Sequence, residues 1–334
     1  MAQTDRLSLP FENGTIEIPT DGSILVVNAQ SCPAYDLLPK DRTTCLQDFF
    51  PTHDHLSKSG FNLSPEMGKR HTLAIVHLIR SRDENRAHIA RAYGALAPEG
   101  ILVIDGAKTD GIESQLKAVK KLLPVEGAIS KAHGKVFWLE KSTQPNEFAV
   151  WSKALDPAQN ADGYHTQAGI FSESKIDKGS LELVPHLAGK LKGVGADLGA
   201  GWGYLAQQAL DANSAITNLN LIEAHVGALN CAKLNVTDER ATFTWADATT
   251  LGANGTLDFV ITNPPFHQSR KADPALGQRF IESAARLLKP TGKLFMVANR
   301  QLAYEATLDA SFRNVERLSQ SSQYKCFFAR KPKL

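Results

Sequence analysis

Residues 257–266 read LDFVITNPPF. An apolar run this short, ended by turn residues, is typical of a buried strand. Asn263-Pro264-Pro265-Phe266 then predicts a loop at the carboxyl end of that strand. The two prolines fix φ and lack a backbone N–H, and each disfavours the helical region for the residue before it. We therefore expect a stiff loop whose carbonyl oxygens are free to accept hydrogen bonds.

This loop has the groups needed to hold a planar amine. The side-chain oxygen of Asn263 and the carbonyl of Pro264 can accept the two amine hydrogens, while Phe266 stacks on the attached ring. We expect these three residues and Pro265 to be catalytic in an enzyme that methylates an exocyclic or amide nitrogen. Asn-Pro-Pro also occurs in ordinary turns. Whether this loop is functional therefore depends on the residues at the other strand ends.

A second loop precedes it at residues 193–205, GVGADLGAGWGYL, which predict a strand, a glycine loop and a helix. Glycines allow positive φ and close approach of a ligand, and a helix start leaves free N–H groups. Asp197 before Gly199, Gly201 and Gly203 would repel a phosphate and attract an ammonium. That charge favours S-adenosylmethionine over a dinucleotide, so we expect these four residues to bind it.

Two further acids follow predicted strands. Glu223 ends the run 219–224 and can hold both ribose hydroxyls, as carboxylates do in other α/β nucleoside sites. Asp247, followed by Ala248, ends the run 242–248 and can accept from the adenine amine. Because carboxyl ends of parallel strands share one sheet edge, we expect Glu223, Asp247, Ala248 and Asn263 to complete the cofactor site.

The chain contains an internal repeat. Residues 88–100 align with 280–292 at an offset of 192, which matches Pro98-x-Gly100 to Pro290-x-Gly292. Residues 135–141 align with 325–331 at an offset of 190. Both halves alternate strand-like and helical runs, which argues for two α/β domains of one fold.

The first copy lacks the site. Its counterpart of the proline-loop strand, near residues 74–78, leaves about eight fewer residues before the next helix, and its first strand ends in Asn28 with no glycine cluster. We expect a degenerate domain at 1–155 that docks or supports RNA, and a catalytic domain at 156–334. The polar segment 142–168 is the expected connection, with residues 148–151 packing on one domain.

Composition limits the remaining functions. The chain has 334 residues and a formal net charge of +2, long enough for two cores but not strongly basic, so any nucleic-acid contact must rest on local patches. The four scattered cysteines, and the absence of a signal-like or membrane-length run, favour a cytoplasmic protein with no membrane partner. The histidines have no metal-binding spacing, and no metal is expected.

The motifs together resemble class I S-adenosylmethionine-dependent methyltransferases. Residues 168–180, AGIFSESKIDKGS, are similar to the segment that leads into the catalytic domain of ribosomal RNA guanine-N2 methyltransferases. The resemblance implies two tandem Rossmann-like domains with seven-stranded, mostly parallel sheets, the first degenerate. It also implies methylation of the guanine N2 amine in small-subunit (16S) ribosomal RNA, naked or in the small ribosomal subunit, with S-adenosylmethionine as cofactor.

Several points stay open at this stage. Large-subunit (23S) RNA, a glutamine amide and an adenine amine are alternative acceptors, and a non-catalytic RNA-binding assembly factor is a further alternative. Phe266, His267, Arg270 and Lys271 are the expected substrate contacts, and His267 is the nearest candidate to receive the proton. Further phosphate contacts are predicted at the C-terminus, at Arg330, Lys331 and Lys333. We also expect a monomer.

Overall fold

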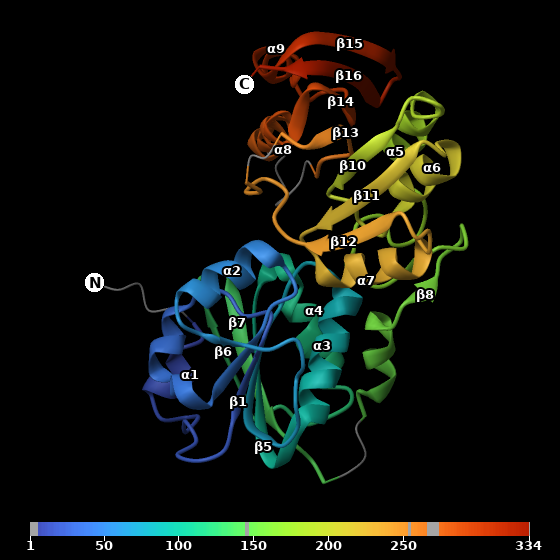
Figure 1. Cartoon of the computed structure of the whole chain (residues 1–334). Helices are drawn as coiled ribbons and strands as arrows, with labels where there is room; N and C mark the ends of the chain where they lie inside the picture. Colours follow the sequence, from blue (N-terminus) through green and yellow to red (C-terminus); the bar gives the residue numbers. More distant parts are fainter. Residues whose placement is uncertain (1–5, 144–146, 253–254, 266–273, 334) are drawn as a thin grey trace. The chain divides into compact units, whose positions relative to one another are not determined.

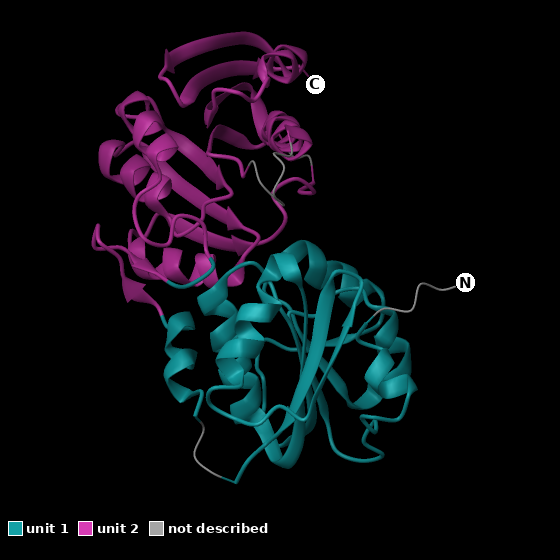
Figure 2. Cartoon of the chain, turned by 180° about the vertical axis from the view of Figure 1, so that it is seen from behind, with its two compact units in different colours: residues 1–156, 167–169 teal, residues 157–166, 170–334 magenta. Residues whose placement is uncertain are grey.

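A computed structural model describes residues 6–143, 147–252, 255–265 and 274–333 (Figure 1). The chain divides into two compact units: unit 1 comprises residues 1–156 and 167–169, and unit 2 comprises 157–166 and 170–334 (Figure 2). The main division falls one residue after the expected boundary at 155/156. The chain also returns to unit 1 for residues 167–169, which the sequence did not predict.

Unit 1 contains a seven-stranded sheet in the order β3-β2-β1-β4-β5-β7-β6, in which only β7 runs antiparallel to its neighbours. Its strands are β1 (Ile24–Val27), β2 (Thr43–Leu46), β3 (Asn62–Leu63), β4 (His71–His77), β5 (Leu96–Ala107), β6 (Gly127–Lys131) and β7 (Gly134–Glu140). Its α-helices are α1 (Leu9–Glu12), α2 (Phe50–Lys58), α3 (Arg82–Ala95) and α4 (Ile112–Val119).

Unit 2 repeats this topology in the order β12-β11-β10-β13-β14-β16-β15, with β16 as the antiparallel strand. Its sheet strands are β10 (Gly193–Leu198), β11 (Ile216–Glu223), β12 (Ala241–Trp245), β13 (Leu257–Thr262), β14 (Leu288–Asn299), β15 (Phe312–Gln320) and β16 (Tyr324–Pro332). Its α-helices are α5 (Lys178–Leu183), α6 (Tyr204–Ala212), α7 (Val226–Asn235), α8 (Pro274–Leu287) and α9 (Glu305–Ser311). A two-stranded ribbon, β8 (Ala158–Gln159) with β9 (His165–Thr166), precedes α5.

The two sheets confirm the predicted fold class and the internal repeat. Helix α3 and helix α8 begin 192 residues apart, at Arg82 and Pro274, and the strands after them keep the same offset. Residues 78–81 connect β4 to α3, whereas residues 263–273 connect β13 to α8. Unit 1 therefore has no room for a proline loop like that of unit 2.

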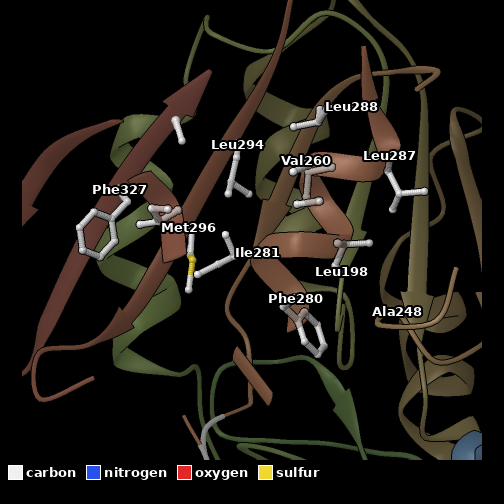
Figure 3. Packing of buried hydrophobic residues seen from close by; sticks show 14 of the residues in the cluster. Leu198, Ala248, Val260, Phe280, Ile281, Leu287, Leu288, Leu294, Met296 and Phe327 are labelled. Carbon is white, nitrogen blue, oxygen red and sulfur yellow. The ribbon is translucent and has the colours of Figure 1, made fainter. Parts of the chain in front are cut away.

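The central strand β13 is buried on both faces. Val260 packs with Phe280 and Ile281 of α8, as Figure 3 shows, while the neighbouring Ile261 belongs to a second apolar cluster that includes Leu205 of α6. Successive side chains of a strand point to opposite faces, so a strand covered on both sides is apolar throughout. This burial explains the continuous run Phe259–Ile261 and holds the strand end rigidly.

The connection between the units is ordered around two contacts in unit 1. Phe148 is fully buried there, with its ring 5.0 Å from that of Tyr93, in line with the expected packing of 148–151. Gly169 has φ +91°, and a Cβ there would overlap the carboxylate of Glu84. Packing within unit 1 thus holds residues that precede and residues that follow the unit 2 segment 157–166.

Gly195 in β10 is expected to tolerate no side chain. A Cβ there would overlap the ring of Phe259 on the neighbouring strand, and forcing extra atoms into a packed core costs about 1–3 kcal/mol. We expect Gly195→Ala to lower the free energy of unfolding of unit 2 by about that amount, measured by urea unfolding followed through tryptophan fluorescence.

Gly252 offers a matched control, because a Cβ there would meet no heavy atom within 4 Å. Gly252→Ala should change stability by no more than about 0.5 kcal/mol. Equal destabilisation by both substitutions would contradict the packing argument.

Candidate functional site

Four strand ends meet at one edge of the unit 2 sheet. Strands β12, β11, β10 and β13 are consecutive neighbours and all parallel, so their carboxyl ends lie together. The chain leaves β10 for β11 on one side, while β13 pairs on the other. Such a switch point is where open α/β sheets bind ligands. The fold thus brings together the ends that carry Asp197, Glu223, Asp247 and Asn263.

The glycine loop after β10 is left-handed at Gly199, Gly201 and Gly203, with φ of 71°, 56° and 92°. Residues with a Cβ rarely adopt such values. A Cβ at Gly199 would lie 3.2 Å from Phe280 Cε1 and 3.9 Å from Pro265 Cδ, so this loop passes close to the proline loop. A Cβ at Gly201 would meet no heavy atom within 4 Å, which leaves its backbone open to a ligand.

Glu223, at the end of β11, is tied to the glycine loop. Its Oε2 accepts from the Gly201 N–H at 2.8 Å, and its Oε1 accepts from the His225 N–H at 2.8 Å. The carboxylate is half-buried. It therefore stands next to the open backbone of Gly201, at a fixed orientation.

Asp247, after β12, organises its own loop. Its Oδ1 accepts from both the N–H and the hydroxyl of Thr249, at 2.8 and 2.7 Å. The buried Ala248 that follows accepts from Ser283 Oγ of α8 at 2.5 Å through its carbonyl. Asp247 and Ala248 are thus held at the sheet edge by α8 and by local hydrogen bonds.

Asp197, which we expect to attract an ammonium, is enclosed in unit 2. Its side chain is fully buried, and neither carboxylate oxygen has a hydrogen-bond partner of ordinary geometry in the part of the chain that the structure describes. Burial, followed by the nearby Glu223 charge, raises the pKa of Asp197 to about 8, although the N–H of Ala206 partly offsets this rise. Unpaired buried carboxylate oxygens favour the binding of a cation, or of a water molecule that donates hydrogen bonds to them.

Asn263 follows β13 and is held by two hydrogen bonds. Its Nδ2 donates to Asp177 Oδ2 at 2.8 Å and to Ser180 Oγ at 2.9 Å. An ionised carboxylate only accepts hydrogen bonds, so the nitrogen of the amide must face Asp177. The Asn263 oxygen is therefore directed away from Asp177 and Ser180 and is available as an acceptor.

Sequence reasoning did not assign Asp177 or Ser180 a role. Asp177 is also the N-cap of α5, where its Oδ2 accepts from the Ser180 N–H at 2.9 Å. The available signal was the segment 168–180, which we matched to the methyltransferases as a whole without considering its polar side chains. An Asp three residues before a Ser at a helix start was the specific pattern that was overlooked.

An open pocket reaches from the glycine loop to Asn263. The segment before α5 forms one wall and is anchored by Trp202, whose Nε1 donates to the Phe171 carbonyl at 3.0 Å. The lining residues are Phe171, Ser172, Asp177, Ser180, Gly199, Ala200, Gly201, Trp202, Tyr204, Leu205 and Asn263.

The remaining predicted residues divide into three groups. Pro264 is buried and Pro265 exposed, whereas Phe266, His267, Arg270 and Lys271 lie outside the described residues. Of the C-terminal cations, Arg330 lies opposite Lys293 in the β14–β16 ladder, and Lys293 in turn lies opposite Phe259 of β13. The role of Arg330, Lys331 and Lys333 as phosphate contacts stays a prediction.

Unit 1 carries different side chains at the equivalent strand ends. Strand β1 pairs with β4 as β10 pairs with β13, and the register places His77 where unit 2 has Asn263. His77 is almost fully buried and hydrogen-bonds through Nε2 to Tyr35 Oη at 2.7 Å. Its Nδ1 lies 3.1 Å from Gln30 Nε2 and 3.3 Å from Asp105 Oδ2. A buried polar network therefore occupies this edge of unit 1, where unit 2 has an open pocket.

The described residues contain neither a membrane-spanning helix nor a metal-binding cluster. None of their helices is long and apolar enough to cross a membrane. They also contain no group of three or more histidine, cysteine, aspartate or glutamate side chains placed to hold a metal ion.

Comparison with known proteins points to one kind of enzyme. Residues 163–327 match the methyltransferase small domain. The chain is 30% identical over 247 residues to the ribosomal RNA small subunit methyltransferase C of Shewanella loihica, covering 71% of this chain and 70% of the relative. It is 26% identical over 332 residues to the protein of that name in Shewanella pealeana, covering 93% and 95%.

Among solved structures, the chain resembles the T. thermophilus 16S rRNA N2 methyltransferase (RsmC) in complex with AdoMet and guanosine. The TM-score is 0.76 at 22% identity, and the match covers 98% of this chain and 92% of that one. At this identity the likeness establishes the fold. It extends over both units of the chain.

Asp197 should make the stability of unit 2 depend on pH. Its pKa is raised from 3.8 to about 8 on folding, so the folded chain holds a proton that the unfolded chain has lost between these pH values. The free energy of unfolding should therefore fall as the pH rises from 5 to 8, relative to Asp197→Asn, which does not titrate. Urea unfolding of both proteins at the two pH values measures this, and a pH-independent difference would count against it.

Proposed function

The chain belongs to the ribosomal RNA small subunit methyltransferase C family, and we propose that it methylates the exocyclic N2 amine of a guanine in small-subunit (16S) ribosomal RNA. The observation that carries this proposal is the orientation of Asn263, whose amide nitrogen is held by Asp177 and Ser180. The amide oxygen is thereby presented beside the pocket at the glycine loop.

S-adenosylmethionine is the proposed cofactor, and it supplies a methyl group made electrophilic by a sulfonium. Gly201 leaves its backbone open to the cofactor, whereas Gly199 and Gly203 let the loop pass close to Phe280 and to Val236 with positive φ. Glu223, beside Gly201, is suited to the ribose hydroxyls once its present hydrogen bonds rearrange. The two unpaired oxygens of Asp197 supply negative charge behind the loop, where an ammonium would lower the pKa of the carboxyl.

Asp247 and Ala248 complete the proposed cofactor site at the adenine end. Asp247 Oδ1 is already an acceptor for Thr249, and a carboxylate has further lone pairs for an amine. The buried Ala248 offers a small apolar surface beside it. The residues at the four strand ends are thus chemically matched to the successive parts of one nucleoside cofactor.

The guanine amine needs two acceptors in fixed positions. Its lone pair is delocalised into the ring, which makes it a poor nucleophile. Asn263 Oδ1 and the Pro264 carbonyl would accept its two hydrogens and favour a tetrahedral nitrogen, with no strong base required. Positioning of this kind supplies up to about 7–11 kcal/mol of barrier reduction, and the proton is lost afterwards to water or a neighbouring acceptor.

The wider setting of the proposal is a cytoplasmic monomer. Its substrate is small-subunit RNA, naked or within the small ribosomal subunit. Unit 1 serves as a docking and supporting module, because polar side chains fill the edge of its sheet where a cofactor would sit. A glutamine-directed enzyme is disfavoured, since such enzymes usually carry a small helical first domain, and unit 1 is an α/β sheet domain.

Asn263→Ala should abolish methyl transfer and leave the cofactor site intact. Removing one preorganised hydrogen-bonding group costs about 10²–10³ in kcat, while AdoMet affinity by calorimetry should change no more than a few-fold. The assay is radiolabelled methyl transfer to small-subunit RNA transcribed in vitro and to small subunits from cells lacking the enzyme. Full activity of the variant would remove Asn263 from the mechanism.

Asp177 should act through Asn263. Asp177→Ala removes the acceptor that orients the amide, so we expect kcat to fall at least about ten-fold. Asp177→Asn keeps an oxygen that can accept from Asn263 Nδ2, but its own NH₂ can also donate to the amide oxygen, so this variant should recover only part of the activity. A failure of Asp177→Asn to exceed Asp177→Ala would show that the carboxylate has another role, such as cation binding.

A further inference from the structure

We propose that Lys178 and Arg300, with Tyr324 between them, form the surface of unit 2 that binds the RNA strand next to the target nucleotide. We call these three residues the Lys178–Arg300 rim. The inference rests on the proposed function, and it specifies where the substrate strand runs. It identifies the partner as single-stranded RNA that flanks an extruded base.

The rim is connected to the amine site by a chain of contacts. Asp177, which bonds Asn263, directly precedes Lys178. A Cβ at the next residue, Gly179, would lie 3.0 Å from Asp177 Oδ2 and 2.8 Å from Tyr324 Cε1. The ring of Tyr324 thus stands beside the residues that orient Asn263.

Arg300 closes the rim on the other side. It follows β14, whose last residue Asn299 pairs with Tyr324, and its N–H donates to the Gln323 carbonyl at 2.7 Å. Lys178 therefore precedes a residue that contacts the start of β16, and the backbone of Arg300 contacts the residue before β16 directly. They share the carboxyl edge of the sheet with Asn263.

The two cations of the rim are not held in ion pairs within the described part of the chain. Lys178 and Arg300 are exposed, and neither forms an ion pair with any residue that the structure describes. The surrounding acids are already engaged: Asp177 with Asn263 and Ser180, Glu182 with Ser321 Oγ at 2.7 Å, and Glu305 with Lys325 at 2.7 Å. Asp177 and Glu182 keep their negative charge, because their partners are neutral, but both are held by these hydrogen bonds, so the exposed side chains of Lys178 and Arg300 remain available to phosphate.

This arrangement suits RNA whose target base is flipped out. Sequence-specific RNA enzymes act on unpaired nucleotides, whose backbone is held by cations and whose bases or sugars meet aromatic side chains. A guanine bound at Asn263 has its own phosphate and the adjacent one close to the mouth of the site. The rim supplies two cations and a half-buried tyrosine next to that mouth.

Arg330 and Lys331 provide a matched control. They are exposed cations of the same unit, yet Arg330 lies opposite Lys293 in the ladder, six residues before the end of β14 that precedes Arg300. A general effect of lowering the net charge by two would appear equally in both double variants. An effect of the rim would appear only in one.

The test compares wild type, Lys178→Gln/Arg300→Gln and Arg330→Gln/Lys331→Gln in the full chain. The RNA probes are in vitro transcribed small-subunit RNA and small subunits from cells lacking the enzyme. For the rim variant we expect affinity to fall on the order of 10-fold at 0.1 M salt. The slope of log affinity against log salt should fall by about 0.7 for each cation removed. AdoMet affinity should stay unchanged in all three proteins.

The outcomes separate the two proposals. If wild type methylates neither probe, the proposed function fails whatever the rim does. If wild type methylates either probe but the two double variants show the same affinity and salt slope, the rim is not the RNA surface. Loss confined to the rim variant, with normal AdoMet binding, supports the assignment.

Discussion

The hydrogen bond from the Asn263 amide to the Asp177 carboxylate is the constraint on which the site depends. An asparagine amide has two nearly symmetric orientations, and only one of them offers an acceptor to an incoming amine. A carboxylate on the other side removes the choice, because it cannot donate to the amide oxygen. Ser180 contributes the second contact. Strand β13 is buried on both faces, which fixes the backbone position of Asn263. The hydrogen bonds then only have to set the orientation of its amide.

The two units show how one scaffold supports two outcomes. Their sheets have the same strand order, and the strands at the centre keep equivalent registers. In unit 2 the strand ends are followed by glycines and a long proline-containing connection, which leave space. In unit 1 the positions are taken by Asn28 and His77, and the buried Tyr35 and Asp105 with the exposed Gln30 complete a polar cluster. Side chains at this sheet edge give the buried polar groups hydrogen-bond partners, which they would otherwise lack when no ligand binds.

Much of the architecture could be predicted from local patterns, and the misses have identifiable causes. The constant offset of 192 residues placed α3 and α8 correctly, because a duplicated fold preserves element lengths. The glycine loop, Glu223 and Asp247 lie at the carboxyl ends of strands as predicted, because a hydrophobic run in the sequence indicates where a buried strand ends. The burial of Asp197, the hydrogen bond from Asn263 to Asp177 and the position of Arg330 in the sheet are tertiary facts. No spacing in a single sequence reveals which side chains meet across eighty or more residues.

The path of the chain between the units bears on how such a protein can be rebuilt. Residues 157–166 belong to unit 2, 167–169 to unit 1, and 170 onwards again to unit 2. The sequences of the two units are therefore interleaved in this segment. Dividing the chain at any single point between residues 157 and 169 would remove residues from at least one unit. Depending on the position of the cut, gene shuffling that exchanged one half for a homologue would break contacts such as Gly169 with Glu84 or His165 with Asn235. After the original duplication, the halves would be inherited and diversify together.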